Sequence, residues 1–245
     1  MRAWRRQGWL EQRTRWLFAR GVPAKAELDV PTERHGIGSA AYNILSDRLS
    51  PGSIVYSFGV GCDVSFDVSL IERHGVEVHA FDPTAESATY LSTQTLPEHF
   101  HFHQWALGAH DGEATFSSVV PTTNEHYRAG TILKIGSRET TVVPTYTLPT
   151  IMDRLSHTQL EILKLDIEGS EFRLFEGLAD YDLPVRQIIV ELHPHISNIE
   201  HHRLMVGRHG WRRSLDFLEQ LRSVGYRIFD ISERGTEFAL VRETR

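Results

Sequence analysis

The chain has 245 residues and a mass of 28.0 kDa, and it is 40% hydrophobic and 24% charged, which suits one α/β domain with a large core. Its net charge of −6 at pH 7 argues against general nucleic-acid binding, so we expect no nucleic-acid partner. The single cysteine, Cys62, excludes an internal disulfide framework and cysteine-rich zinc clusters. Because no apolar run approaches the length of a membrane span, we expect a cytoplasmic protein without one.

The first 21 residues mix arginines with tryptophans and predict a helix whose charges interrupt any signal-peptide core. Such a helix could lie on a membrane surface or pack on protein. We favour packing on the domain or on a second subunit of a homo-oligomer, because a single short basic helix anchors weakly to lipid. Residues 1–50 are therefore predicted to be an N-terminal helical extension and connector. Within them, residues 35–49 are expected to form a short helix.

The next stretch combines a strand, a glycine turn, a helix and a second strand that ends in an acid. Residues 54–58 are apolar and predict a buried strand, and Gly59 and Gly61 then allow a sharp turn that can approach a ligand closely. A helix is expected over residues 65–75, and the following strand ends at Asp82. Asp82 lies 21 residues after Gly61, the usual offset for a carboxylate that accepts hydrogen bonds from ribose hydroxyls.

The third glycine of the dinucleotide-binding fingerprint is missing, since the loop continues Cys62-Asp63-Val64-Ser65. That glycine normally permits close packing beside a pyrophosphate. A cofactor with adenine and ribose but no pyrophosphate would not require it. S-adenosylmethionine is therefore the expected cofactor, and a nicotinamide-dependent oxidoreductase is the alternative.

The remainder of the chain alternates between helix and strand patterns. Helices are expected over 83–91, 148–155, 170–178 and 211–224, and strands over 101–105, 113–119, 140–146, 161–165, 187–190, 226–231 and 237–242. This alternation predicts one α/β domain over residues 51–245, with an open, doubly wound, mainly parallel sheet. The last two strands are expected to form a hairpin.

Four runs resemble the FkbM-type, methyltransferase-like domain family of class I S-adenosylmethionine-dependent methyltransferases. They are Tyr56-Ser57-Phe58-Gly59-Val60-Gly61, Ala80-Phe81-Asp82-Pro83-Thr84, Ala106-Leu107-Gly108 and Lys164-Leu165-Asp166-Ile167-Glu168-Gly169-Ser170-Glu171. The last run is the most specific. The resemblance implies methyltransferase activity and a Rossmann-like, seven-stranded sheet in the order 3-2-1-4-5-7-6 with an antiparallel final strand.

The resemblance also indicates where a cofactor would bind. In an open α/β sheet the ligand lies beyond the carboxyl ends of the strands, where the strand order reverses, here between strands one and four. We expect the residues at this edge to bind the cofactor, with the glycines and the acid on its methionine and ribose ends and the tryptophan near adenine. They are Phe58, Gly59, Gly61, Asp82, Pro83, Trp105, Ala106 and Asp166. The alternative for Asp82 is a cap of the next helix.

Three side chains are predicted to be catalytic residues and metal ligands. Asp166 ends the fourth strand, Glu191 ends the fifth, and His193 follows two residues later, so adjacent parallel strands would bring them to one edge. Such a set can bind Mg²⁺ or Mn²⁺. The alternatives are a helix cap for Asp166, a salt bridge for Glu191, and base catalysis by His193 without a metal. For Glu168 and Glu171, a site role and a helix-dipole role are both open.

The expected reaction is methyl transfer to a hydroxyl of a sugar, a polysaccharide or a secondary metabolite, so the predicted partner is a small-molecule or glycan acceptor. A hydroxyl is a poor nucleophile at neutral pH and needs a general base or a metal that lowers its pKa. N-methylation of an amine or a peptide is an alternative, as are the oxidoreductase and a catalytically silent binding module.

Overall fold

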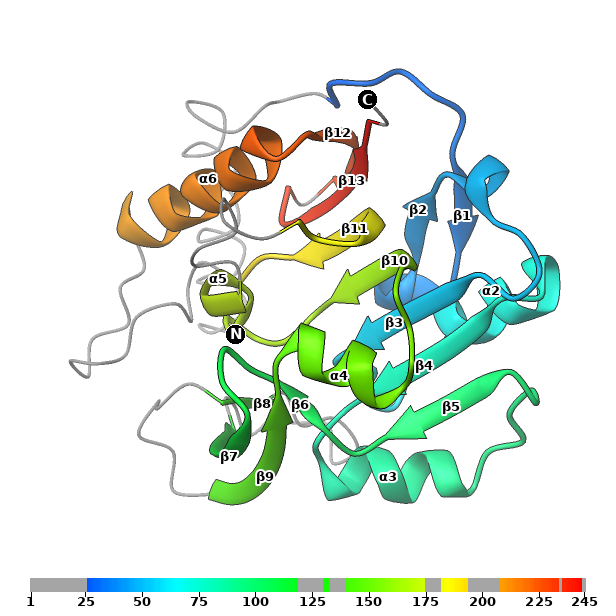
Figure 1. Ribbon diagram of the computed structural model, residues 1–245, viewed down its shortest axis with the longest axis vertical. Coiled ribbons are helices and arrows are strands. Elements are labelled where there is room, and N and C mark those ends of the chain that lie inside the picture. Colours follow the sequence, from blue (N-terminus) through cyan, green and yellow to red (C-terminus); the bar gives the residue numbers. More distant parts are fainter. Residues whose placement is uncertain are drawn as a thin grey trace, which may run out of the picture.

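The computed structural model describes residues 26–118, 130–132, 140–174, 182–193, 208–233 and 235–243. Its centre is a seven-stranded sheet, whose strands are labelled in Figure 1. In spatial order they are β12 (Tyr226–Ile231), β13 (Glu237–Arg242), β11 (Val185–Glu191), β10 (Leu160–Leu165), β3 (Ile54–Phe58), β4 (Glu77–Phe81) and β5 (Phe100–His103). Neighbouring strands from β11 to β5 run parallel, and β13 is antiparallel to both of its neighbours.

Numbered by chain order within this sheet, the strands follow the sequence 3-2-1-4-5-7-6. The predicted α/β fold, with its doubly wound sheet and antiparallel final strand, is therefore confirmed. The order reverses between β3 and β10, which places a ligand crevice at their carboxyl ends.

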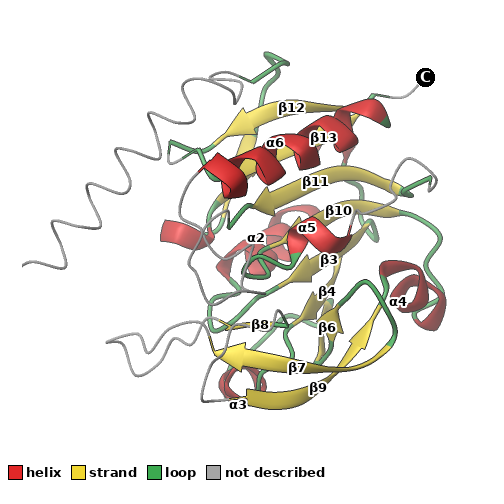
Figure 2. Cartoon of the chain, turned by 90° about the vertical axis from the view of Figure 1, so that its left-hand side faces the viewer, coloured by secondary structure: helices red, strands yellow, loops and turns green. Residues whose placement is uncertain are grey.

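Helices cover both faces of the sheet, as Figures 1 and 2 show. One core contains residues of α4 (Leu148–Arg154), α5 (Glu171–Leu174) and α6 (Arg208–Ser223), and the other contains residues of α2 (Ser65–His74) and α3 (Ala85–Ser92). Alternate residues of β3 divide between the two cores, Tyr56 in the first and Val55 in the second. Because both of its faces are buried, β3 reads as a nearly continuous apolar run.

A second, four-stranded sheet stands beside the end of β5. It has the order β6 (Ala106–Leu107), β9 (Thr140–Tyr146), β7 (Gly112–Ser118) and β8 (Gly130–Thr131), and Figure 2 shows it next to the main sheet. The strand patterns of β7 and β9 were predicted, but their separation into another sheet was not. Since β6 follows β5 after two residues, this sheet forms one side of the ligand edge.

The expected helix over residues 35–49 is wrong. The segment contains the antiparallel strands β1 (Glu33–His35) and β2 (Tyr42–Ile44), with short 3-10 helices over Gly38–Ala40 and Ser46–Arg48. Gly36 takes a φ of 89°, in the left-handed region that a helix does not use, and this residue begins the turn between the strands.

Apolar burial then holds this hairpin against the main sheet. Tyr42, Ile44 and Leu45 are buried in the core that α2 shares, and the Gln187 side chain bonds both backbone groups of Leu45. The boundary drawn at residue 50 stays a prediction, and the helix predicted over residues 1–21 lies outside the described residues. In the described ranges, no helix has the length and apolar character needed to cross a membrane.

Candidate active site

A cavity opens at the carboxyl ends of β3, β4 and β10. All eight residues predicted to bind the cofactor line it, together with residues of the second sheet. The eight are Phe58, Gly59, Gly61, Asp82, Pro83, Trp105, Ala106 and Asp166. Four separate stretches of sequence therefore meet around one space, at the point where the strand order reverses.

Gly59 joins the ends of three strands. Its φ is 74°, and a Cβ added there would lie 1.7 Å from the carbonyl oxygen of Asp166. Its N–H donates to the carbonyl of Phe81, while the Asp166 N–H donates to the carbonyl of Phe58. Only glycine allows the turn after β3 to approach the loop after β10 so closely.

Asp82, directly after β4, holds the turn that follows β3 by accepting from its backbone. It is buried, with one oxygen accepting from the Gly61 N–H at 2.9 Å and the other accepting from the Thr84 N–H at 3.0 Å. Thr84 in turn is the N-cap of α3 and accepts from the Ser87 N–H. The Thr84 hydroxyl also donates to this second oxygen of Asp82. A carboxylate offers about four lone-pair positions, so these three contacts leave acceptor capacity for a ribose hydroxyl at the cavity.

Aromatic rings form the other wall of the cavity. Phe58 and Phe81 stack with centroids 4.3 Å apart, His103 stacks on Phe81 at 4.9 Å, and Trp105 lies 4.8 Å from His103. Trp105 also meets the ring of Tyr146 edge to face. Of these rings, Phe58, Phe81 and Trp105 line the cavity and give it an apolar, aromatic wall of the kind that an adenine can contact.

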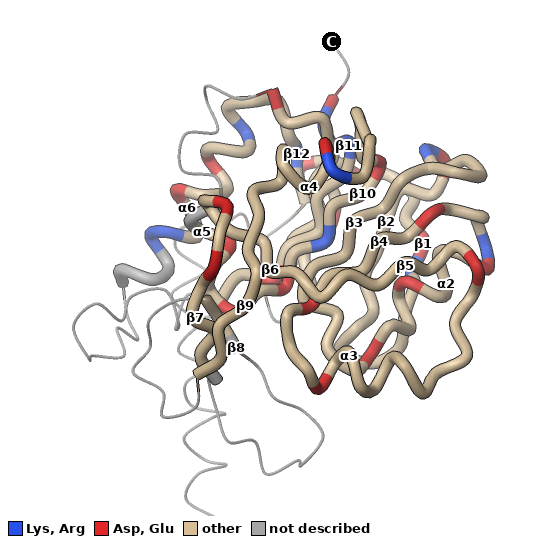
Figure 3. The backbone as a smooth tube through the Cα atoms, turned by 60° about the horizontal axis from the view of Figure 1, so that its bottom comes forward, with Lys and Arg blue, Asp and Glu red and all other residues tan. Residues whose placement is uncertain are grey.

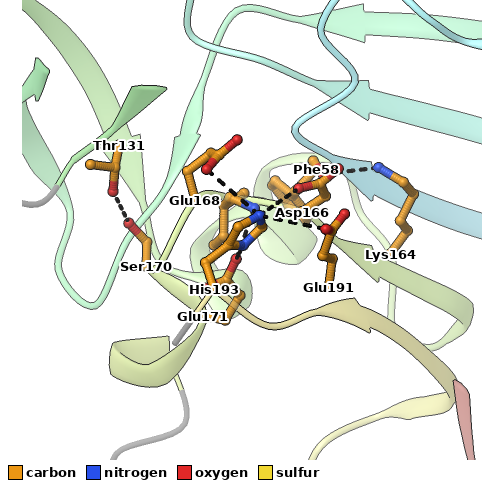
Figure 4. Close-up of polar contacts among 10 residues, drawn as sticks. Phe58, Thr131, Lys164, Asp166, Glu168, Ser170, Glu171, Glu191 and His193 are labelled. Atoms are coloured by element: carbon orange, nitrogen blue, oxygen red, sulfur yellow. Dashed lines mark hydrogen bonds and ion pairs between the residues drawn. The ribbon is translucent and has the colours of Figure 1, made fainter. Parts of the chain in front are cut away.

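A cluster of carboxylates surrounds His193 beside this cavity (Figure 4). Its Nε2 lies 3.8 Å from Asp166, 3.6 Å from Glu168 and 3.8 Å from Glu191, measured to the nearest carboxylate oxygen. On the other side of the ring, Nδ1 lies 3.0 Å from Glu171. The structure thus brings the three predicted catalytic residues together and adds both of the glutamates whose roles were open.

Glu171 orients the imidazole. It is fully buried at the start of α5, and its Oε1 accepts from the Ile167 N–H at 3.1 Å and from Nδ1 of His193. With the Nδ1 proton donated to Glu171, Nε2 faces the other carboxylates. The turn before α5 directs Glu168 back to this point, since Glu168 has a φ of 53° and Gly169 one of 92°.

Burial and like charge set the electrostatics of the cluster, and Figure 3 shows acidic positions in red beside α5. Burial, with Asp166 nearby, raises the pKa of Glu191 to about 7 although His193 acts in the opposite direction. Burial also raises the pKa of Glu168. For His193, burial lowers the pKa, but Glu171 and the other carboxylates outweigh it and raise the pKa well above 6.5. The cluster is therefore built to hold a cation, either a proton on His193 or a metal ion.

The residues present fit a divalent metal. Asp166, Glu191 and His193 each offer a ligand atom, and these atoms lie within 4.8 Å of one another. Atoms bound at about 2.1 Å to one ion lie about 3.0–4.2 Å apart, a range that includes both 3.8 Å separations from Nε2. Two carboxylates with one imidazole are a donor set for Mg²⁺ or Mn²⁺. The Glu171 contact matches the outer carboxylate that commonly orients a metal-binding histidine.

Lys164, in the most specific motif, directs its Nζ to the carbonyl of Phe58, as Figure 4 shows. It is buried, with Nζ 3.5 Å from the Phe58 carbonyl and 5.4 Å from the centre of the Tyr42 ring. Its charge opposes that of Asp67, whose pKa burial raises to about 6 despite Lys164. Sequence reasoning missed Asp67. The signal was an acid on the apolar side of α2, next to Phe66.

The strand order and the position of the cavity are those of a class I S-adenosylmethionine-dependent methyltransferase domain. The chain belongs to the methyltransferase FkbM domain family, whose model matches residues 53–228. This finding confirms the family resemblance carried by the four sequence runs.

Two curated relatives share part of the chain. "Probable methyltransferase-like protein 24" of Homo sapiens is 29% identical over 149 residues, which cover 60% of this chain and 34% of the relative. The Rattus norvegicus protein of the same name is 30% identical over 149 residues, with the same coverage. The chain thus spans about a third of the length of these relatives.

Similarity to solved structures is more distant. The fibrillarin pre-rRNA processing protein of Methanococcus jannaschii has a TM-score of 0.43 and 10% identity, covering 90% of this chain and 88% of that one. A candidate tRNA (m1A22) methyltransferase of Streptococcus pneumoniae, in complex with S-adenosyl-L-methionine, has a TM-score of 0.38 and 12% identity, covering 80% and 69%. The family assignment does not depend on either structure.

Proposed function

We propose that the domain transfers the methyl group of S-adenosylmethionine to a hydroxyl of a sugar, a polysaccharide or a secondary metabolite, with a divalent cation held by Asp166, Glu191 and His193. The observation that carries this proposal is the meeting of two carboxylates and an oriented imidazole beside the cofactor cavity. An acceptor hydroxyl requires such activation, because its pKa lies far above neutral.

The cavity residues have separate roles in this proposal. When bound, S-adenosylmethionine supplies an electrophilic methyl group, and the protein supplies alignment. Asp82 accepts from the ribose hydroxyls, Gly59 and Gly61 let the backbone approach the methionine part, and Trp105 stacks on adenine. The positions of these residues on the cavity wall support the proposed roles.

Asp166 connects the two halves of the site, since it lines the cavity and belongs to the His193 cluster. A bound divalent ion would lower the pKa of the acceptor hydroxyl and fix its direction. Glu171 keeps the Nδ1 proton of His193 in place, so that Nε2 is presented as a ligand. Glu168 adds negative charge that favours a cation at this point.

A metal-free mechanism is the second candidate, and the pKa of Glu191 is the observation that favours it. A carboxyl whose pKa is about 7 can accept a proton near neutral pH, as a general base must. His193 is less suited to this role, because its raised pKa keeps the imidazole protonated. In this mechanism the His193 cation would hold the carboxylates in place.

The test begins with full-length protein stripped by a chelator and offered S-adenosylmethionine with a panel of glycosides. Native mass spectrometry scores bound cofactor and added methyl. We expect the stripped protein to bind cofactor without turnover, and Mg²⁺ or Mn²⁺ to restore turnover. Asp166→Asn and Glu191→Gln should each lower turnover by about a hundredfold or more. Glu191 does not line the cavity, so Glu191→Gln should leave cofactor affinity nearly intact. Glu113→Gln, at an exposed carboxylate, is the matched control.

Manganese binding, followed by calorimetry, gives a readout that needs no acceptor. Loss of Mn²⁺ binding in Asp166→Asn and Glu191→Gln, but not in Glu113→Gln, would support the metal site. Full turnover in metal-free protein, abolished by Glu191→Gln, would instead establish the base mechanism. Unchanged turnover in both site variants would remove these residues from the reaction.

A further inference from the structure

A second group of metal-ligating side chains lies on β1 and α2. Glu33 and His35 share one face of β1 because residues two apart in a strand point the same way. The strand runs along α2, where Ile37 N–H donates to Ser65 Oγ, and the last residue of α2, His74, completes the group. His74 lies about 13 Å along α2 from Ser65, which is at the end that borders the turn after β3, and His35 contacts Ser69 near the middle of this helix.

The distances within this group match those between ligands of one ion. Glu33 Oε1 lies 3.2 Å from His35 Nε2 and 3.4 Å from His74 Nε2, and all three atoms fall within 4.8 Å of one another. Ligand atoms about 2.0–2.1 Å from a tetrahedral Zn²⁺ ion lie about 3.3 Å apart.

The histidines are not using these nitrogens for hydrogen bonds. The His35 side chain is 0% exposed, yet across the described part of the chain neither its Nε2 nor that of His74 has a hydrogen-bond partner. Glu33 lies close to both nitrogens but off the direction of a hydrogen bond. Ligands that point at a common ion have this relation, because each is directed at the ion and not at its neighbour.

We propose that Glu33, His35 and His74 bind a zinc-class transition-metal ion, with a fourth, exchangeable position for water. Two imidazoles and one carboxylate are a known donor set for Zn²⁺, whereas Mg²⁺ prefers oxygen ligands. The ion would fix the β1–β2 hairpin to α2, the helix that directly follows the cofactor turn. This site is separate from the Asp166, Glu191 and His193 cluster proposed for methyl transfer.

The surroundings support this site. His35 Nδ1 lies 2.9 Å from Ser69 Oγ, so an outer contact orients this imidazole. Burial lowers the pKa of His35, which favours the neutral imidazole that a metal requires. The site also lies at the C-terminus of α2, where the helix dipole favours a cation.

Arg73 is the competitor for Glu33. Its guanidinium contacts Oε1 of Glu33, and Figure 3 shows acidic and basic positions beside β1 and α2. The Arg73 side chain is 52% exposed, so it can turn into solvent when an ion binds. Without an ion, the group would be an ion-pair network that depends on Arg73.

The test uses full-length protein without a histidine tag, stripped of metal and titrated with Co²⁺ as a spectroscopic substitute for Zn²⁺. We expect the visible absorption of tetrahedral cobalt in the wild type and in Glu191→Gln. His74→Ala and Glu33→Gln should weaken this binding at least about tenfold. His99→Ala is the matched control, because Glu77 accepts from His99 at 2.6 Å and from His101 at 2.8 Å through separate oxygens.

Zinc should also stabilise the folded protein. At about a hundredfold excess over its Kd, Zn²⁺ is expected to raise Tm by about 5–10 °C in the wild type but not in His74→Ala. Circular dichroism checks that the variants are folded, and Glu33→Gln repeats the test if His74→Ala is not. Equal cobalt spectra in wild type and both variants, an octahedral spectrum, or a zinc-independent Tm would each overturn the proposal.

Discussion

Two groups of histidines, one at the ends of β10 and β11 and one on β4 and β5, lie in opposite electrostatic surroundings. His193 lies among four carboxylates at the ends of β10 and β11, and its pKa is raised well above 6.5. On β4 and β5, His79 and His103 stack on one another at 5.2 Å, and burial together with neighbouring histidines lowers their pKa values to about 3 and about 4. Burial lowers the pKa in both regions, so the neighbours decide the result.

The second region is an array of neutral rings. His79 Nδ1 is 3.0 Å from His103 Nε2, His157 packs edge-on against His79 at 4.7 Å, and His157 Nδ1 is 2.7 Å from the Tyr56 hydroxyl. The array continues through His103 to Trp105 and so reaches the cavity at the carboxyl ends of β3, β4 and β10. One region is therefore suited to hold a cation, while the other is suited to form a rigid aromatic wall.

The largest expected difference between the two regions is in the free energy of unfolding that is lost when one carboxylate is removed from each. Glu171 is fully buried against His193, and Glu171→Gln takes away the closest opposite charge, so we expect a loss of about 3 kcal/mol or more in the free energy of unfolding. Glu77 pairs with His99 and His101 near the surface, where its side chain is 28% exposed. Glu77→Gln should therefore cost less than about 1 kcal/mol.

Urea unfolding of the two variants, at pH 7 and without metal, measures this difference. Equal costs at the two positions would mean that the carboxylates around His193 do not hold a buried charge. A native-like circular dichroism spectrum of Glu171→Gln before unfolding is the necessary control.

The two regions should also separate cofactor binding from chemistry. Trp105 lines the cavity at the end of the ring array, and Trp105→Ala removes the surface proposed for adenine, which should weaken S-adenosylmethionine binding by about 1–3 kcal/mol. Glu191 and His193 are not among the residues that line the cavity, so Glu191→Gln should leave cofactor affinity within about threefold.

Calorimetry with S-adenosylmethionine and with its demethylated product checks both expectations. Tyr90→Ala, at an exposed aromatic residue on α3, is the control for loss of a ring. Unchanged affinity in folded Trp105→Ala would place adenine elsewhere in the cavity.

Much of the fold was predictable because its signals are local. The apolar run before Gly59, the positive φ that this residue needs, and the offset to Asp82 all lie within one βαβ unit. Asp166 and Glu191 could be placed at one edge because each ends a strand and the strands are neighbours. The seven-strand order came from the family resemblance, since periodicity alone does not order strands.

The missed features depend on contacts between distant residues. Residues 35–49 are helix-like in composition, but the turn at Gly36 and the bonds between Leu45 and Gln187 favour a hairpin. Glu171 and His193 are 22 residues apart in the sequence and meet because one follows β10 and the other follows β11. No local sequence pattern predicts that the Glu33 carboxylate lies beside His74, the last residue of α2.

The smallest expected effect is a change in how stability depends on pH. In the unfolded chain the histidines of the ring array bind protons below about pH 6.5, whereas His79 and His103 have folded pKa values of about 3 and about 4. The unfolded state therefore binds more protons as the pH falls, so the stability from this region is fully present above pH 6.5 and is lost toward pH 4.

The contribution of His193 to stability depends on pH in the opposite direction. Its folded pKa is raised, so its contribution is fully present below about pH 6.5 and is lost as the pH rises through the folded value. His79→Phe keeps an aromatic ring in the array but removes one titrating group. It should therefore reduce the free energy of unfolding that is lost between pH 7 and pH 5 by about 1 kcal/mol, a value lowered for the partial exposure of the His79 ring. Urea unfolding of chelated protein across this range measures the slope, and His110→Asn, at an exposed histidine, should leave it unchanged. If His79→Phe kept the full acid slope, the ring array would not be the source of the acid sensitivity, and the two regions would not differ as their neighbours predict.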